Sequence, residues 1–195
     1  DSVAKNPLGA LKSLQNYDMA VIAKPTETFT DAEKQVLDQY IINGGKTLWL
    51  VDQVTAEMDS LYNPSGSTLA YPRDLNLNDM FFKYGVRINP NLIKDIMATP
   101  ISLATGNQGS ATQYTQYTWL YSPMIYPTSK NPIVNNVDGL KFEYTNSIDT
   151  LKNGIKKTVL LKSSRYSKKI GTPVEVNLEI VAEETSPNHY INTGN

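Results

Sequence analysis

The sequence predicts an α/β fold whose first half holds a core of parallel strands. Two short, nearly continuous apolar runs, residues 18–23 and 46–51, are typical of strands buried on both faces of a sheet. A helical pattern with a clear start and stop lies between them. Short connections from strand to helix to strand favour a parallel pair with a right-handed crossover. Beyond about residue 90 mainly strand signals remain, which indicates additional strands in the second half.

Length and composition limit the class of protein. The chain has 195 residues, of which 40% are hydrophobic, so it is long enough to bury a core. We expect one α/β domain over residues 1–195, with its core at about 1–90 and a strand-rich elaboration at about 91–185. The net charge of -1 argues against nucleic acid as a partner, because binding dominated by phosphate contacts needs a basic excess. No apolar run reaches the roughly 18 residues that span a bilayer.

The first expected element is a short amphipathic helix. Leu8, Leu11 and Leu14 recur at helical spacing, which predicts a helix over about residues 6–15. The strand at 18–23 follows it. Because a helix precedes the first strand, and because the chain begins with Asp1 and shows no signal peptide, we expect a piece of a longer protein in which an upstream strand was cut away.

The helix between the two strands has recognisable ends. Thr30 and Glu33 form a capping box, in which each side chain can bond the backbone N–H of the other. Gly44 or Gly45 supplies the left-handed stop. The apolar side of this helix carries Ala32, Val36, Leu37, Tyr40 and Ile41.

Less regular signals follow the second strand. Residues 53–75 read as a long loop because prolines, a glycine and small polar residues gather there. Asn76 is expected to cap a short helix that Gly85 ends, and residues 86–88 look like a third strand. Later strands are expected near 92–97, 101–104, 117–121, 140–144, 155–162 and 174–180, with residues 105–116 as a polar loop.

Several stretches together resemble a known family. They are Tyr17–Pro25, Asp31–Glu33, Asn43–Asp52, Asn76–Asn89, Ser147–Asp149, Ile155–Leu161 and Ser163-Ser164. In this order they are similar to the gliding-motility-associated ABC transporter proteins (GldG) of the Bacteroidetes, and the resemblance covers most of the chain.

The resemblance implies a fold, a location and a role. The fold is a flavodoxin-like or glutamine-amidotransferase-like three-layer core with a parallel sheet. The full protein is anchored in the inner membrane, exposes this domain on the periplasmic face, and works beside a permease and an ATPase in gliding and protein secretion. The resemblance implies no catalytic residue in this chain.

The sequence lacks the groups that an enzyme of this fold would use. A nucleophile needs a base within hydrogen-bonding reach, and the chain has no cysteine and no Gly-x-Ser-x-Gly elbow. Its one histidine, His189, lies in the C-terminal tail. We therefore expect no enzymatic activity.

Neither a metal nor a phosphate group is expected to bind. Several carboxylates gather around the long loop, but their spacing matches no known calcium loop, so solvated side chains are the favoured interpretation; they are Asp52, Glu57, Asp59, Asp74 and Asp79. Residues 43–46 lead from a helix into a strand, whereas a phosphate cradle needs a helix N-terminus. We expect no cofactor.

Binding residues are suggested first by topology. In open α/β sheets, ligands sit beyond the carboxyl ends of the parallel strands. Here those ends and the following loop supply Lys24, Asp52, Gln53, Arg73 and Asn76. The alternative is that the loop merely covers a pocket that has lost its ligand, and this alternative is favoured.

An aromatic stretch is the second candidate. Tyr117, Trp119 and Tyr121 fall on one face of a strand because side chains alternate along it. Packing against the core is the first interpretation, a protein interface the second and stacking on glycans the third.

A basic stretch runs through Lys156, Lys157, Lys162, Arg165, Lys168 and Lys169. It could face a membrane surface or an acidic partner. The glutamates that follow, including Glu183, are expected to neutralise it locally.

Two functions remain open. The first is a periplasmic interaction domain that docks on the permease and other motility components, with a homo-oligomer possible. The second is a solute- or glycan-binding receptor domain that feeds the transporter. A receptor should show a deep pocket, and an interaction domain a sizeable apolar patch.

Overall fold

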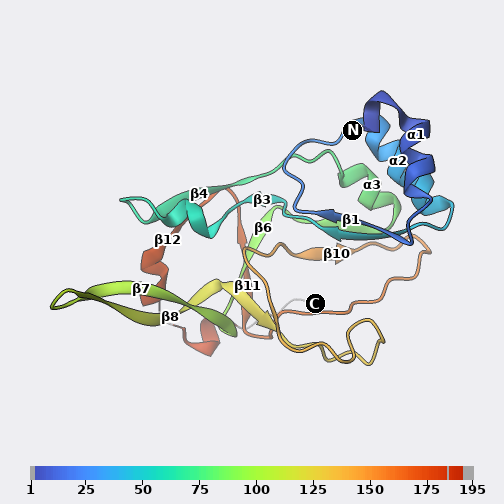
Figure 1. Cartoon of the computed structure of the whole chain (residues 1–195). Helices are drawn as coiled ribbons and strands as arrows, with labels where there is room; N and C mark the ends of the chain where they lie inside the picture. Colours follow the sequence, from blue (N-terminus) through green and yellow to red (C-terminus); the bar gives the residue numbers. More distant parts are fainter. Residues whose placement is uncertain (1–2, 184, 191–195) are drawn as a thin grey trace. The chain divides into compact units, whose positions relative to one another are not determined.

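The computed structural model describes residues 3–183 and 185–190 (Figure 1). They fall into two compact units, each built from several stretches of chain. Unit 1 comprises residues up to Gln53, Arg73–Asn89 and Ile148–Lys157, and unit 2 comprises Val54–Pro72, Pro90–Ser147 and the chain from Thr158 onward. None of the helices in the described part has the length and apolarity that a bilayer crossing requires.

Unit 1 holds a short parallel strand pair with helices. Its elements are η1 (Val3–Lys5), α1 (Pro7–Leu14), β1 (Met19–Ala23), α2 (Asp31–Ile42), β2 (Lys46–Leu50), α3 (Asn78–Lys83), β5 (Val86–Ile88) and β10 (Ile148–Thr150). β1 and β2 pair in parallel, with Val21 opposite Leu48, which confirms the predicted strand–helix–strand unit. β5 pairs antiparallel with β10, far along the chain.

The helix ends of unit 1 follow local sequence rules. At the start of α2, the Glu33 backbone N–H donates to the Thr30 hydroxyl at 3.3 Å, and the Thr30 backbone N–H donates to the Glu33 carboxylate at 2.9 Å. The predicted capping box is therefore confirmed. Gly44 follows the helix at a φ of +93°, which a glycine adopts without strain.

The core of unit 1 lies between α2, α3 and the strands. Leu75, Leu77, Met80 and Phe81 are buried together, and Trp49 of β2 packs edge-on against Phe81 with ring centroids 5.1 Å apart. Burial of these side chains holds α3 in place and supplies much of the apolar contact of the unit.

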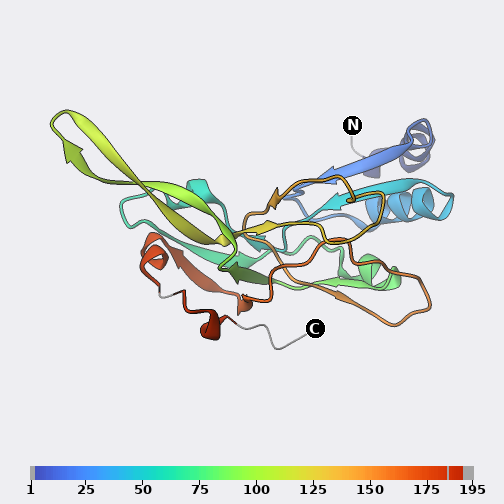
Figure 2. The same ribbon diagram turned by 90° about the horizontal axis from the view of Figure 1, so that it is seen from below.

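Unit 2 consists of small antiparallel sheets. Its strands are β3 (Val54–Thr55), β4 (Ser67–Pro72), β6 (Asn91–Asp95), β7 (Ala98–Gln108), β8 (Ala111–Ile125), β9 (Leu140–Lys141), β11 (Ser167–Gly171) and β12 (Val174–Asn177). They form the sheets β12-β4-β3, β11-β6 and β7-β8-β9. Short 3-10 helices complete the unit: η2 (Met58–Leu61), η3 (Leu178–Ala182) and η4 (Pro187–His189). Figure 2 shows the long β7–β8 hairpin reaching out as a two-stranded ribbon.

Aromatic side chains sit at the centre of unit 2. Trp119 and Tyr121 of β8 and Tyr144 are buried with aliphatic residues from β4, β6 and β12. The Tyr121 and Tyr144 rings stack with centroids 5.9 Å apart. The first interpretation of the aromatic stretch, packing against the core, is thus confirmed for Trp119 and Tyr121.

The predicted fold class is wrong. A flavodoxin-like or glutamine-amidotransferase-like three-layer core needs an extended parallel sheet, and the described residues form a parallel pair of two strands beside small antiparallel sheets. The reason lies in pairing over long sequence distances. The strand at 86–88 pairs with Ile148–Thr150 instead of extending the parallel pair.

Several local predictions also need correction. Leu77, not Asn76, is the N-cap of α3, and the strand expected over 174–180 ends at Asn177. Residues 53–75, expected as a loop, contain β3 and β4, and residues 105–116, also expected as a loop, form the end of the β7–β8 hairpin. Residues 155–162 are not a strand. Hairpin pairing accounts for residues 105–116, because polar residues can form a ribbon when both strands come from adjacent chain.

Candidate functional site

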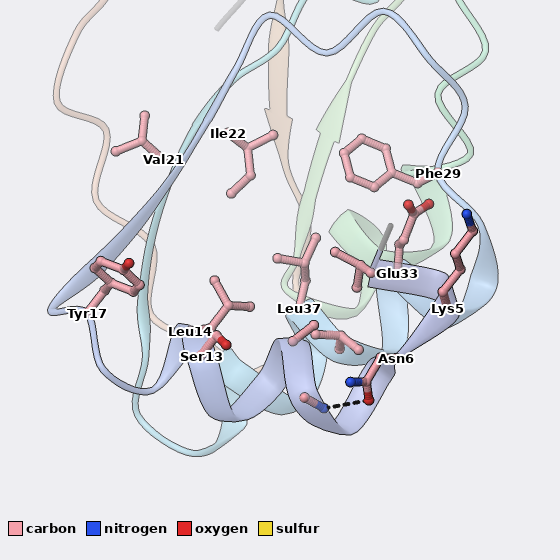
Figure 3. A pocket seen from close by; sticks show the side chains of 14 residues that line it. Lys5, Asn6, Ser13, Leu14, Tyr17, Val21, Ile22, Phe29, Glu33 and Leu37 are labelled. Carbon is pink, nitrogen blue, oxygen red and sulfur yellow. Dashed lines mark hydrogen bonds between the residues drawn. The ribbon is translucent and has the colours of Figure 1, made fainter. Parts of the chain in front are cut away.

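A pocket in unit 1 lies beside the outer edge of β1, between that strand and the helices α1 and α2 (Figure 3). Its volume is about 800 Å³. Most lining side chains are apolar, including Leu14, Val21, Ile22, Phe29, Val36 and Leu37. Figure 3 shows Phe29, Glu33 and Lys5 at one end and Tyr17 with Leu14 at the other. The pocket is therefore an apolar space with its charged groups toward one end.

The position of β1 explains how this pocket arises. β1 pairs with β2 along one edge, and no strand pairs with its other edge in the part of the chain that the structure describes. Val21 and Ile22 are neighbours in β1, so their side chains point to opposite faces of the strand, yet both line the pocket. The pocket therefore reaches around the outer edge of β1, where backbone N–H and C=O groups face away from β2.

Capping interactions hold the rim of the pocket. The Asn6 side chain accepts a hydrogen bond from the Gly9 backbone N–H at 3.0 Å, which fixes the start of α1 (Figure 3). The Glu33 carboxylate accepts from both the backbone N–H and the hydroxyl of Thr30, so the capping box of α2 also positions a carboxylate at the pocket. Tyr40 of α2 donates to the Tyr17 carbonyl at 3.1 Å and holds the connection that leads into β1.

One face of the parallel pair is open and largely apolar, with Lys46, the partner of Met19, as its charged residue. Met19, Val21, Leu48 and Leu50 are 49%, 54%, 43% and 52% exposed. All four belong to the same face, because the burial of both strands alternates residue by residue. The sequence predicted strands buried on both faces, and that part of the prediction is wrong. We refer to these four side chains as the apolar face.

The residues predicted at the strand ends do come together in unit 1. Lys24, exposed, follows β1 and donates its backbone N–H to the Leu50 carbonyl at 2.7 Å. Arg73 donates its backbone N–H to the Gln53 carbonyl at 2.8 Å and its guanidinium to the Pro25 carbonyl at 3.2 Å. Asp52, next to the buried Gln53, is half-buried. Arg73 thus serves the backbone of this region, and a ligand role for the group stays a prediction.

Asn76 belongs to a polar network that links the helices α2 and α3. Its side-chain amide donates to the Phe29 carbonyl at 2.8 Å and accepts from the buried Lys34 ammonium at 3.2 Å. Lys34 also pairs with Asp79 at 2.9 Å. The hydrogen bond from Asp79 raises the pKa of Lys34 against the opposing effect of burial, and the same bond lowers the pKa of Asp79. The network ties α2 to α3 and holds Asn76 beside Phe29 of the pocket.

The aromatic candidates divide between core and surface. Trp119 and Tyr121 are buried, so their rings are not available for stacking on a sugar in this structure, while Tyr117 is half-buried. Burial, with a smaller effect of the Glu183 charge, raises the pKa of Tyr121 to about 12. Tyr121 therefore stays neutral near pH 7.

A second hollow, in unit 2, lies beside a partly buried ion cluster. Its volume is about 660 Å³, and Lys94, Tyr121 and Glu183 contribute to its lining. Glu183 pairs with Lys94 at 2.6 Å and with Lys168 at 3.2 Å, and it also accepts a hydrogen bond from the buried Tyr190 hydroxyl. Burial alone would raise the pKa of Glu183, but the bonds from Lys94, Tyr190 and Lys168 outweigh it and lower the pKa to about 2. The predicted local neutralisation of the basic stretch is confirmed at Lys168.

Comparison with known proteins places the chain in a family. Residues 1–195 match the family described as ABC-type uncharacterized transport system. The chain belongs to this family. This confirms the ABC-transport part of the resemblance and is consistent with an accessory role in such a system. The assignment to gliding-motility proteins is not part of this match.

Two further similarities are weaker. A protein of Borreliella burgdorferi described as uncharacterized is 27% identical over 158 residues, which cover 79% of this chain and 29% of that protein. The chain thus spans less than a third of the length of this curated relative. A solved structure, the mmIFT52 N-terminal domain, is similar with a TM-score of 0.48 and 17% identity, covering 84% of this chain and 60% of that one.

The sequence did not reveal the pocket or the apolar face of this family member. The apolar run at 18–23 was visible, but which of its side chains would be covered depends on α1, α2 and the missing strand partner on one edge. The sequence also did not indicate that Lys94, Lys168 and Glu183 form one ion cluster. Its one visible signal was Lys94, a charged residue that follows the apolar Leu92 and Ile93 in β6.

Proposed function

We propose that this chain is a non-enzymatic interaction domain of its ABC-type transport system and that it binds an extended apolar segment of another component along β1. The observation that carries the proposal is the combination of an open strand edge with an exposed apolar face. Exposed apolar patches of this kind mark protein interaction sites.

The geometry favours a segment in extended conformation. A strand added at the outer edge of β1 would use the backbone N–H and C=O groups that face away from β2. Its side chains would alternate between the apolar face and the pocket lined by Ile22 and Leu37. Backbone hydrogen bonds would then supply affinity, and the pocket would supply selectivity for apolar side chains.

The apolar face also supplies the driving force. Covering an aliphatic side chain contributes roughly 25 cal/mol for each Å² of apolar surface removed from water. Four side chains that are each about half exposed can together contribute a few kcal/mol, which is enough to determine whether a complex forms.

Binding to the permease and the other membrane components of the same transport system, purified in detergent, tests this proposal. We expect Val21→Glu and Leu48→Glu to weaken capture of a component by at least about tenfold, because each buries a charge at the contact. Ile133→Glu is the matched control, since Ile133 is an exposed aliphatic side chain of unit 2, 71% exposed. Equal capture by the two face variants and the wild type would contradict the proposal.

The pocket also supports the alternative of a solute- or glycan-binding receptor domain. Its volume of about 800 Å³ lies within the range of small-molecule sites. Its lining favours an apolar solute over a glycan. A thermal-shift screen against sugars, peptides and apolar solutes tests this, because a ligand of the folded state raises the melting temperature. Ala10→Phe, which places a ring in the pocket, should abolish such a shift.

The finer proposal concerns the biological setting. The resemblance of residues 17–25, 43–52 and 76–89 to gliding-motility proteins supports a domain at the periplasmic face of the inner membrane, acting in gliding and protein secretion with the permease and other motility components as partners. In unit 1, Lys24, Asp52, Arg73 and Asn76 are proposed as further contact residues, with the buried Gln53 supporting them. In unit 2, Tyr117 is proposed as a separate contact residue, with Trp119 and Tyr121 supporting it from the core. A chromosomal Val21→Glu variant that is produced normally and still glides and secretes would contradict this setting.

A further inference from the structure

The β7–β8 hairpin forms an exposed arm. In the part of it that spans residues 104–116, every described side chain is exposed, so both faces of the ribbon are in solvent. Figure 2 shows the two strands twisting around each other as they extend from unit 2. A two-stranded ribbon without a covered face is only marginally stable in water. Such an element gains stability when another strand pairs with it.

The arm carries no charge. Residues 96–129 contain no Asp, Glu, Lys, Arg or His, although 19% of the chain as a whole is charged. Proteins usually place charged residues, Lys above all, on exposed strand edges to prevent pairing with other chains. Their absence over the whole arm removes the electrostatic obstacle to pairing, including the like-charge repulsion that two copies of one segment would otherwise feel.

The two edges of the arm differ. The edge formed by β7 includes Pro100, which lacks a backbone donor, and Thr105 is an extra residue of β7 at the register shift between Ala104 and Gly106. Proline and bulges protect edges. Along the other edge, β9 pairs only with Met124 and Ile125, so no strand covers residues 111–118 in the described chain. The open, regular edge is therefore that of β8.

We propose that β8 pairs antiparallel with β8 of a second copy of this chain, about a two-fold axis at Thr115. Residues 112–118 read Thr-Gln-Tyr-Thr-Gln-Tyr-Thr. In this register Thr115 faces its own counterpart, Thr112 faces Thr118, and each tyrosine faces a glutamine. Thr–Thr pairs are stabilising across antiparallel strands. A two-fold axis makes each pair beside the axis occur twice, whereas the Thr115 pair on the axis occurs once.

Side-chain contacts within the arm fit this register. Gln116 donates its amide Nε2 to the Ser102 hydroxyl at 2.6 Å, which leaves its Oε1 as an acceptor. The Tyr114 hydroxyl of the second copy faces that residue, and Tyr114 is 68% exposed. Thr115 and Thr105 share a hydrogen bond at 2.9 Å, which holds the central residue in position across the ribbon.

A second copy accounts for these features better than a membrane or a different protein. The arm is rich in Thr, Gln, Ser and Asn, whose polar groups would lose hydrogen bonds in hydrocarbon. Pairing with a second copy requires residues 112–118 to be complementary to themselves, and they are. Pairing with an unrelated strand would not require this order. The protected edge of β7 also stops further addition, so pairing ends at a dimer and does not continue into a fibre.

Cysteine cross-linking tests the register directly, because the chain has no cysteine of its own. Opposed residues of an antiparallel pair have Cα atoms about 4.5–5.5 Å apart, within the roughly 4.4–6.8 Å of a disulfide. We expect Thr115→Cys to form a disulfide-linked dimer under mild oxidation. Ala104→Cys, exposed on β7 opposite Tyr114, is the control and should remain monomeric on a non-reducing gel.

Sedimentation equilibrium of the whole chain gives the second readout. We expect the wild type to show a monomer–dimer equilibrium and Thr115→Lys to weaken it by about tenfold or more, since two lysines then meet at the axis. Ala104→Lys adds the same charge to the arm away from the contact and should leave the equilibrium unchanged. Far-ultraviolet circular dichroism checks that both variants fold.

Three results would overturn the proposal. A wild type that stays monomeric into the millimolar range would exclude the dimer. Equal cross-linking of Thr115→Cys and Ala104→Cys would show that the disulfides form by random collision of two chains and not in the proposed strand register. Association of the monomer with phosphatidylcholine vesicles, lost in Thr115→Lys, would assign the arm to a membrane surface. None of these results bears on the apolar face of unit 1, so the two proposals fail separately.

Discussion

The strand pair β1–β2 and the hairpin β7–β8 both leave an edge open, but they expose different chemistry. The parallel pair is short and presents Met19, Val21, Leu48 and Leu50 to solvent. The hairpin is long and presents threonine, glutamine and tyrosine without any charge. One region therefore gains free energy when almost any apolar surface covers it. The other gains chiefly from backbone hydrogen bonds and cross-strand pairs, which depend on register.

Because of this difference, the two surfaces should select their partners in different ways. Apolar burial is non-directional, so selectivity at β1 has to come from the shape of the adjacent pocket. A polar ribbon buries little apolar area, so selectivity at β8 has to come from the order of its residues. Binding at β1 should accordingly show a clearly negative heat-capacity change, and pairing at β8 a small one.

The hydrophobic cores of the two units also differ in how far their side chains are exposed. This difference leads to the largest expected effect. Trp119 is fully buried in unit 2, whereas Trp49 in unit 1 is only half-buried. We expect Trp119→Ala to lower the free energy of unfolding by about 3–5 kcal/mol, the usual cost of removing a large buried aromatic side chain. Trp49→Ala should cost roughly half as much, because part of its surface is already in water.

The chain has two tryptophans, one in each unit, so fluorescence can follow each unit by itself. Because each variant removes the tryptophan of the unit that it changes, circular dichroism during urea unfolding measures the loss. The remaining tryptophan, Trp49 in Trp119→Ala and Trp119 in Trp49→Ala, shows whether the other unit is unchanged. Equal losses from the two variants would break the comparison between a closed and an open core.

The ion cluster of unit 2 provides the next largest effect. Glu183→Gln keeps the shape but removes the charge that Lys94 and Lys168 share, and leaves a largely buried ammonium without its partner. We expect a loss of about 1–3 kcal/mol, since hydrogen bonds to charged groups are worth about that much. Glu175→Gln is the matched control, because Glu175 lines the same hollow but is exposed.

The same glutamate predicts a pH dependence. Its pKa is about 2 in the folded chain and 4.5 as the reference for the unfolded one, so folding favours the charged form. The stabilisation is fully present above pH 4.5 and is lost as the pH falls from 4.5 toward 2. The free energies of unfolding of the wild type and of Glu183→Gln, measured in urea between pH 7 and pH 3, should therefore approach each other as the pH falls below 4.5. A constant difference across that range would contradict the assigned pKa.

Local signals made part of the fold predictable. The apolar runs at 19–23 and 46–50, the capping box at Thr30 and the glycine after α2 act through neighbouring residues, so sequence reasoning placed these elements well. The sheet could not be predicted in the same way. Whether residues 86–88 extend the parallel pair or join Ile148–Thr150 depends on competition between distant segments, and the latter pairing prevails. The polar hairpin was missed because its strands lack the apolar alternation that marks a strand.

The candidate site shows the same limit. Topology correctly grouped Arg73 and Gln53 with the residues near the strand ends, yet the contacts of Arg73 run to backbone carbonyls. The pocket beside β1 needs the packing of α1 against α2, which no local pattern encodes. The apolar face was read as buried, because an apolar run looks the same whether its second face is covered or open.

The smallest expected effect concerns the helix that borders the pocket. Thr30→Ala removes the cap of α2 and frees the Glu33 carboxylate that its hydroxyl and backbone hold, which should cost about 1 kcal/mol. Thr26→Ala, at an exposed threonine in the preceding connection, is the control. In a Trp119→Phe background, the fluorescence of Trp49 should register the loss in unit 1. If the loss appeared instead in the Trp119 signal of a Trp49→Phe background, the cap would be stabilising unit 2, and the separation on which the comparison rests would not hold.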